Sequence, residues 1–233
     1  MTALLTLNNV AMRYPSPSGS GDRAHSVFDG INLEVQRGER LGVVGRNGVG
    51  NSTLLRIMAK IFAPYSGEVT WAPKITVSLL TLGLGFRPDL TGRENALLAC
   101  LLQGLSKQDA KAAVGAIQAF TEIGDFFDAP VRAYSSGMRA RLGFAAALAN
   151  RSDVILIDET LGVGDAIFNQ KAREVLKGHM IEERGIVIVS HTATQIKTLC
   201  DRALWLEEGR ISADGEPVDV LAKYAAISAR PPI

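Results

Sequence analysis

A short segment, residues 45–53, combines closely spaced glycines with hydroxyl and amide side chains, a set of residues that suits phosphate binding. It follows an apolar run over 41–44 that predicts a buried strand, and it opens a helical pattern over 52–60. Glycines let successive backbone N–H groups point at one anion, and the helix start adds the positive end of its dipole. The segment therefore predicts a nucleotide phosphate-binding loop, with the candidate ligands Gly45, Asn47, Gly48, Gly50, Asn51, Ser52 and Thr53.

One position of this loop departs from the usual pattern. Such loops carry lysine directly before the serine, and this chain has Asn51 there. The lysine is a point charge on the outer phosphates, whereas asparagine is shorter and neutral. Losing one charge-assisted contact costs on the order of a few kcal/mol of binding or transition-state energy. Ser52 keeps the hydroxyl that would contact the Mg²⁺ ion of a bound nucleotide.

Two carboxylates follow an apolar run over 154–157 that predicts a strand buried on both faces. Ligands of open α/β sheets bind at the carboxyl ends of such strands. Asp158 is the candidate magnesium ligand, and Glu159 is the candidate base that polarises the attacking water. The alternative is that the pair only ends a strand and caps the next helix.

A histidine ends a second buried strand, which is expected over 185–189. His191 would contact the γ-phosphate if this strand belongs to the same sheet, although a lone histidine is more often a structural hydrogen-bonding residue. A third feature, the turn of Ser135, Ser136 and Gly137, opens a helix. It is either a well-capped helix start or a second phosphate site, contributed by one protomer to the loop of another.

The elements that must position these groups change in type along the chain. The first third is β-rich, with strands expected at 5–10, 31–35 and 68–71 and a hairpin turn at 38–39 leading into 41–44. The middle is helical, over 92–103, 107–120 and 137–149. The last third alternates helices at 169–182, 192–199 and 217–226 with strands at 185–189 and 203–206. Alternation of this kind predicts a parallel α/β core.

The bulk composition excludes several classes of protein. The 233 residues include 25 basic and 24 acidic side chains, a net charge of +1, so no basic face argues for nucleic acid. The longest strongly apolar run, 95–102, is far short of the roughly 18 residues that a spanning helix needs. The N-terminus does not have the pattern of a signal peptide. Cys100 and Cys200 stand alone in apolar settings and predict buried thiols.

Taken in order, these motifs resemble the ATP-binding cassette of ABC transporters over nearly the whole chain. Residues 45–53 look like the Walker A loop, 154–159 like Walker B, 134–142 like the signature and 161–165 like the D-loop. The resemblance makes His191 the switch histidine, places Asp165 at the nucleotide and makes Tyr14 the aromatic that stacks on adenine. It implies one α/β domain over 1–233: a P-loop NTPase (RecA-like) core with an antiparallel β subdomain, over about 1–85 and 151–233, and an inserted helical subdomain over about 86–150.

Within that family, the chain is similar to cassettes that export bacterial cell-surface polysaccharides, through residues 82–86, 90–95, 134–142 and 163–165. This similarity implies ATP and Mg²⁺ as cofactors and a head-to-tail homodimer. It also implies two integral-membrane permease subunits, a lipid-linked glycan handled indirectly, and a peripheral place on the cytoplasmic face of the inner membrane. The permease is expected to dock beside 82–95, where Phe86 is either an apolar anchor or a core residue. No room is expected for the carbohydrate-binding sandwich that some members carry.

Two further positions depart from the family, and several functions stay open. Ser135-Ser136-Gly137-Met138 replaces the common Ser-Gly-Gly-Gln, and no glutamine near 80–86 matches the one that usually couples magnesium to the membrane subunit. Asn51 leaves open a subunit that binds nucleotide but hydrolyses it weakly or not at all. The exported substrate could also be of another class. A soluble ABC ATPase of DNA repair or translation usually needs a second cassette or a long coiled coil, which this sequence lacks.

Overall fold

The computed structural model describes residues 2–15, 25–80, 86–149, 152–158, 166–177 and 183–228. The chain divides into two compact units. The first, called the core unit below, comprises Met1–Leu79, Asp153–Glu159 and His179–Ile233. The second, called the helical unit, comprises Leu80–Ser152 and Thr160–Gly178.

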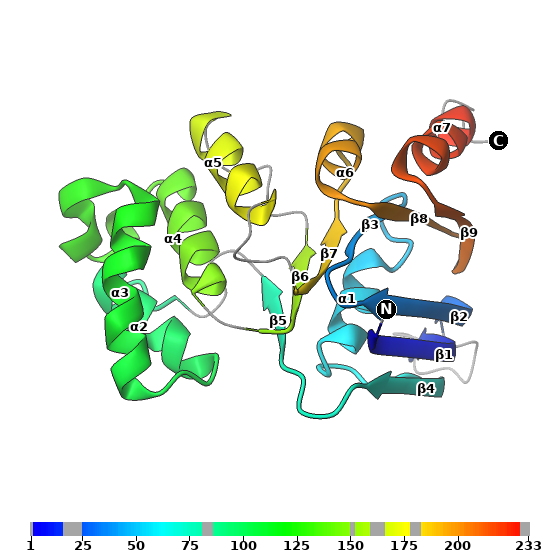
Figure 1. Cartoon of the computed structure of the whole chain (residues 1–233), viewed down its shortest axis with the longest axis horizontal. Coiled ribbons are helices and arrows are strands. Elements are labelled where there is room, and N and C mark those ends of the chain that lie inside the picture. The colour runs from blue at the N-terminus through cyan, green and yellow to red at the C-terminus, as the bar shows by residue number, and fades with distance from the viewer. Residues whose placement is uncertain are drawn as a thin grey trace. The chain divides into compact units, whose positions relative to one another are not determined.

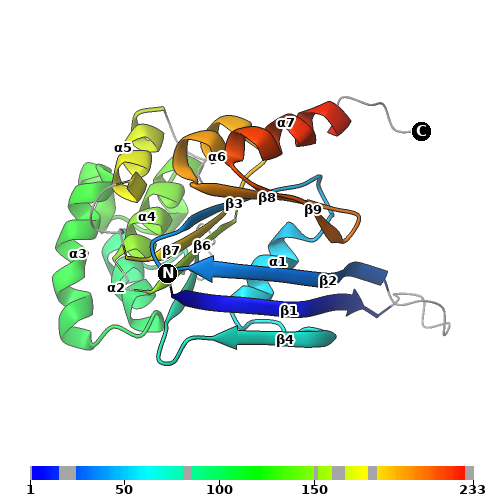
Figure 2. The same ribbon diagram turned by 45° about the vertical axis from the view of Figure 1, so that its right-hand side comes forward.

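A six-stranded sheet forms the centre of the core unit. Its order is β5 (Val77–Leu80), β6 (Val154–Asp158), β7 (Gly185–Val189), β3 (Arg40–Val44), β8 (Arg202–Glu207) and β9 (Arg210–Gly215). Strands β6, β7, β3 and β8 are parallel, and β9 returns antiparallel to β8. Helices α6 (Ala193–Leu199) and α7 (Pro217–Ser228) cover one face, and α1 (Asn51–Met58) lies on the other (Figures 1 and 2). Coverage of both faces explains the continuous apolar sequences of β3, β6 and β7.

A separate antiparallel sheet has the order β2 (His25–Gln36), β1 (Ala3–Tyr14) and β4 (Ser66–Trp71), seen side by side in Figure 2. The predicted hairpin at 38–39 is wrong, because β2 pairs with β1 and the turn carries the chain into the other sheet. The physical reason is burial. Ile31, Leu33 and Val35 face the same hydrophobic cluster as β3, so the two strands stack in layers and do not pair edge to edge.

The helical unit contains α2 (Gly92–Leu102), α3 (Lys107–Thr121), α4 (Ser136–Leu148) and α5 (Ala166–Lys177), with short 3₁₀ turns at Gly124–Asp128 and Val131–Ala133. Side-chain caps begin three of these helices. Thr91 and Glu94 form a capping box for α2, and Ser106 and Ser135 cap α3 and α4.

Helix α5 belongs to the helical unit, whereas its residues were expected in the core. The contacts of one aromatic side chain account for this. Phe168 packs at 5.6 Å from Phe120 and 5.9 Å from Phe144, measured between ring centroids. The described helix covers 166–177, and the predicted extension to residue 182 lies outside the described residues.

The two cysteines are buried free thiols, as predicted. Burial raises the pKa of the Cys200 thiol to about 12. A buried thiol with a raised pKa forms little thiolate, which makes it a packing residue and a poor nucleophile.

Candidate functional site

A cleft of about 340 Å³ opens in the core unit where β3, β6 and β7 end at their carboxyl termini. Its volume falls in the range of about 300–1,000 Å³ that ligand sites occupy. Nine of the predicted site residues line it: Tyr14, Asn47, Gly48, Gly50, Asn51, Ser52, Thr53, Asp158 and His191. The remaining lining residues are His25, Val27 and Val189. The fold thus brings together groups from distant parts of the chain.

The floor of the cleft is the loop before α1 and the first turn of that helix. Gly50 is the N-cap, with a φ of 109° that favours glycine, and a Cβ added there would lie 2.4 Å from Val27 Cγ1. The first intrahelical bond runs from the Leu54 N–H to the Gly50 carbonyl, at 2.8 Å. The amides of residues 51–53 therefore have no acceptor within the helix. Amides in this position, together with the helix dipole, suit a phosphate group.

Asn51 is buried at the start of α1, with 8% of its surface exposed. Its side-chain Oδ1 has no hydrogen-bond partner among the described residues. No lysine or arginine is among the described residues that line the cleft. Among the described residues of the cleft, a bound phosphate would therefore contact backbone amides and neutral side-chain donors, and no lysine or arginine side chain.

Ser52 and Asp158 supply oxygen atoms to the same cleft from two elements, the first turn of α1 and the end of β6. A hydroxyl and a carboxylate are ligands that suit a hard divalent cation such as Mg²⁺. The described residues contain no cluster of three or more His, Cys, Asp or Glu side chains that would hold a metal ion by themselves. Such a cation would therefore need further ligands from a nucleotide or from water.

Tyr14 lies at the end of β1 and reaches the phosphate-binding loop. Its hydroxyl shares a hydrogen bond of 3.1 Å with Thr53 Oγ1, and its ring meets Phe62 edge to face at 6.3 Å between centroids. His25, at the start of β2, is the cross-strand partner of Tyr14. His25 was not among the residues expected from the sequence, because the register between the two strands cannot be deduced from the sequence.

The signature segment belongs to the helical unit. Ser135 caps α4 by accepting from the Met138 N–H at 3.1 Å, which agrees with the capped helix start expected from the sequence. The Tyr134 hydroxyl donates to the Phe126 carbonyl at 2.6 Å, and Arg139 donates to the Tyr134 carbonyl at 2.9 Å. These bonds fix the backbone on both sides of Ser135, while Ser136 and Gly137 form the first turn of the helix.

Several predicted positions are not described. Glu159, Asp165 and the segment 81–85 lie outside the described residues. Phe86 is half-buried and packs against the hydrophobic cluster of the helical unit. Asn95, nearly fully buried, holds the adjoining turn by accepting from the Arg87 N–H and donating to the Leu90 and Thr91 carbonyls. The motif at 90–95 therefore has a structural role within its own unit.

Comparison with known proteins identifies the family of this sequence. The family model described as ABC transporter matches residues 28–162. A teichoic acids export ATP-binding protein, TagH, of Shouchella clausii is 41% identical over 214 residues, which are 92% of this chain and 59% of that protein. An O-antigen export system ATP-binding protein, RfbB, of Myxococcus xanthus is 40% identical, over 85% of this chain and 45% of that protein. The chain thus spans roughly half the length of these two relatives.

A shorter relative matches over most of its length. An O-antigen export system ATP-binding protein, RfbB, of Klebsiella pneumoniae is 37% identical over 87% of this chain and 82% of that protein. Among solved structures, a dimeric ATP-binding cassette bound to ADP and phosphate superimposes with a TM-score of 0.79 at 22% identity, over 91% of this chain and 98% of that one. This likeness confirms the predicted fold class, a P-loop NTPase core with an antiparallel β sheet and a helical unit.

Proposed function

The chain belongs to the ABC transporter family, and on that basis we propose that it is the ATP-binding subunit of a system that exports a lipid-linked cell-surface polysaccharide. The observation that carries the ATP-binding part is the cleft in which the glycine loop, Asp158 and His191 meet. Its similarity to ATP-binding proteins of teichoic acids export and O-antigen export systems supports the class of substrate.

In the proposed mechanism the phosphates of ATP rest on the amides of the loop and of the first turn of α1. Ser52 and Asp158 would hold Mg²⁺, which supplies charge neutralisation at the phosphates. Glu159 orients the attacking water and accepts its proton, and His191 contacts the γ-phosphate. Tyr14 provides a ring for the adenine base. These assignments follow from the order of the motifs and from the cleft that most of them line.

The proposed assembly is a head-to-tail homodimer on two membrane permease subunits, at the cytoplasmic face of the membrane. Ser135, Ser136, Gly137 and Asp165 of one copy would face the nucleotide on the phosphate-binding loop of the other. The described part of the chain has no helix long and apolar enough to cross a membrane. Nucleic acid has no place in this proposal, because the net charge is only +1.

A second candidate function is a subunit that binds ATP and hydrolyses it very slowly. One observation favours it: Asn51 is neutral and buried, and no described cationic side chain lines the cleft. Such a subunit would still close a dimer when nucleotide binds, because closure draws on binding energy and not on hydrolysis.

Phosphate release by the complex with its membrane subunits separates the two candidates. The test compares the natural chain with Glu159→Gln, which keeps the size of the side chain and removes the base. We expect the natural chain to release phosphate and the variant to lose this activity with an ATP affinity within about twofold. Equal background rates for both chains would establish the slow-hydrolysis alternative. Loss of affinity together with turnover would show that Glu159 is not the base.

The class of exported substrate needs a test in cells. Depletion of the chain should leave lipid-linked glycan on the cytoplasmic side and reduce glycan at the cell surface, and re-expression should reverse both effects. An unchanged surface glycan would contradict the substrate class while leaving the ATPase proposal intact.

The docking site proposed beside residues 82–95 is tested with Phe86→Asp in the complex with the membrane subunits. Loss of co-purification with the permease, from a chain that still melts cooperatively, would support the docking site. Loss of folding would instead assign Phe86 to the core.

A further inference from the structure

A buried pair of polar side chains is formed by the residue before His191 and a residue of the helix that follows it. Ser190 and Gln195 are 4% and 5% exposed, and the Ser190 hydroxyl donates to Gln195 Oε1 at 2.7 Å. Neither residue lines the cleft, and neither was among the sequence candidates. Burying a polar side chain costs free energy unless it is hydrogen-bonded, and a satisfied buried pair holds its neighbours in one geometry. Apolar side chains would pack α6 without this requirement, so the question is what the pair holds in place.

The same serine fixes the backbone on both sides of the histidine. The Ser190 N–H donates to the Val43 carbonyl at 3.3 Å, which ties the end of β7 to the strand that leads into the phosphate-binding loop. The Ser190 hydroxyl, while donating to Gln195, accepts from the Thr192 N–H at 3.0 Å. The residues before and after His191 are thus held by one hydroxyl group, whose direction is set by Gln195.

The position of Gln195 depends in turn on the packing of α6 against β3. The helix approaches the strand at Gly42, where an added Cβ would lie 2.7 Å from Ile196 Cγ2 and 3.1 Å from Cys200 Sγ. Ile196 is the neighbour of Gln195 in the same helix and is fully buried. Because a side chain at position 42 would collide with Ile196, glycine allows α6 to lie close to β3, and this packing fixes the backbone of the helix that carries Gln195.

We propose that Gln195 is a positioning residue, which through the Ser190 hydroxyl holds the His191 backbone so that the imidazole meets the γ-phosphate. This inference rests on the proposed role of His191 in ATP binding. It implies that α6, which does not line the cleft, determines the position of His191, which does. The pair acts on the recognition of ATP over ADP, because the two nucleotides differ at the γ-phosphate.

The ratio of ATP affinity to ADP affinity, measured by equilibrium titration of the full chain, is the readout, and it does not depend on hydrolysis. We expect His191→Ala to lower the ratio at least fivefold and Gln195→Leu to lower it to a similar value, with the ADP affinity unchanged. Ser190→Thr keeps the hydroxyl and should keep the ratio. Thr198→Ala, on the exposed side of the same helix, is the matched control and should also keep it.

A double variant separates positioning from stability. Ser190→Ala with Gln195→Leu removes both polar partners, so its melting temperature should recover relative to Gln195→Leu alone. Its affinity ratio should stay low, because the hydroxyl that holds His191 is gone. Recovery of the ratio together with the melting temperature would make the pair merely structural and overturn the inference.

The remaining outcomes distinguish this inference from the proposed function. If His191→Ala lowers the ratio and Gln195→Leu does not, His191 keeps its role and only the positioning inference is wrong. If His191→Ala leaves the ratio unchanged, the assignment of His191 as a γ-phosphate contact is wrong, and the positioning inference falls with it.

Discussion

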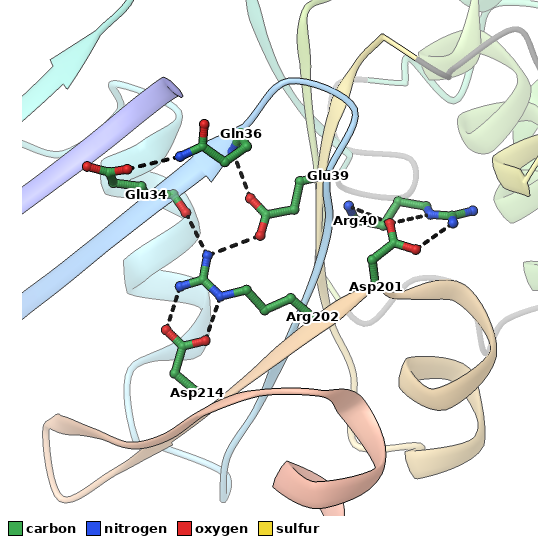
Figure 3. A network of polar contacts seen from close by, with 7 residues as sticks. All are labelled: Glu34, Gln36, Glu39, Arg40, Asp201, Arg202 and Asp214. Atoms are coloured by element: carbon green, nitrogen blue, oxygen red, sulfur yellow. Dashed lines mark hydrogen bonds and ion pairs between the residues drawn. The ribbon is translucent and has the colours of Figure 1, made fainter. Parts of the chain in front are cut away.

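The two ends of the parallel sheet in the core unit have opposite electrostatic designs. At the amino ends of β3 and β8, cationic side chains are paired with carboxylates (Figure 3). At the carboxyl ends, the cleft has no described lysine or arginine in its lining, and Asn51 buries an unpartnered amide oxygen.

The amino end is a closed network. Arg202 donates to Glu39 at 3.0 Å and to the Glu34 carbonyl at 3.2 Å, and forms a two-bond pair with Asp214. Glu39 also accepts from the Gln36 N–H at 2.7 Å, and Arg40 pairs with Asp201 at 2.6 Å. These bonds join β2, β3, β8 and β9. The hydrogen bonds to Asp214 and Glu39 raise the pKa of Arg202, while the hydrogen bond from Arg40 lowers the pKa of Asp201.

The comparison indicates that the charged groups at the amino ends stabilise the fold, whereas the polar groups at the carboxyl ends are available to bind a ligand. Paired charges at the amino end satisfy one another, so they can stabilise the fold but have little capacity left for a partner. Amides and polar side chains at the carboxyl end are incompletely satisfied, which lowers stability and favours an anion that supplies the missing partners. If this comparison is correct, substitutions at one end should change stability and substitutions at the other should change nucleotide affinity.

The largest expected effect is on the amino end, from Arg202→Met. The change leaves the Glu39 carboxylate, whose side chain is only 12% exposed, with the backbone N–H of Gln36 as its remaining donor among the described residues. We expect a loss of about 3 kcal/mol in the free energy of unfolding, measured by urea denaturation, and no change in ATP affinity. Arg210→Met, an exposed residue on β9, is the control and should cost less than about 0.5 kcal/mol. Equal losses for the two variants would remove the distinction between a network and ordinary surface charges.

At the carboxyl end the next effect should come from Asn51→Lys. A lysine there restores a cation at the phosphates, and we expect ATP turnover in the assembled complex to rise at least tenfold, about 1.4 kcal/mol of transition-state energy. The free energy of unfolding without nucleotide should change little. Steady-state hydrolysis by the two chains in the same complex is the measurement, and equal rates would show that position 51 does not limit catalysis.

A smaller effect tests whether polar groups of the cleft add to stability. Tyr14→Phe removes the hydroxyl bonded to Thr53 and keeps the ring that meets Phe62. We expect a loss of about 0.5–1 kcal/mol of unfolding free energy and an ATP affinity within about twofold of the natural chain. A loss of more than about 2 kcal/mol would mean that this part of the cleft stabilises the fold as the amino end does.

The smallest effect is a pH dependence of the amino end. The pKa of Asp201 is lowered in the folded chain, so its pairing with Arg40 stabilises the fold above the unfolded pKa of about 3.9 and is lost as pH falls through the folded value. Because the Asp201 side chain is 48% exposed, solvent screening limits the contribution to about 0.5 kcal/mol. Unfolding free energies of the natural chain and Asp201→Asn should differ by a constant amount well above pH 4 and approach each other only as the pH falls below about 3.9. Parallel curves would contradict the assignment.

The sequence by itself determined the local elements that carry the chemistry. The apolar runs before the glycine loop, Asp158 and His191 predicted three buried strands, and all three are present. The turn at Ser135 was expected to be either a capped helix start or a phosphate site, and Ser135 caps α4 in the structure. Such features depend on residues close together in the chain, where hydrophobic period and capping chemistry are sufficient.

Only the tertiary structure decided which distant residues meet. It placed β2 in a different sheet from β3, added the strands β5 and β9 that the sequence analysis did not identify, and set His25 opposite Tyr14. It also revealed the Ser190–Gln195 pair and the closed network around Arg202. These arrangements depend on strand order and on which faces are buried. Since many pairings are compatible with the same local pattern, they are fixed by the packing of the whole core and not by the residues along any one segment.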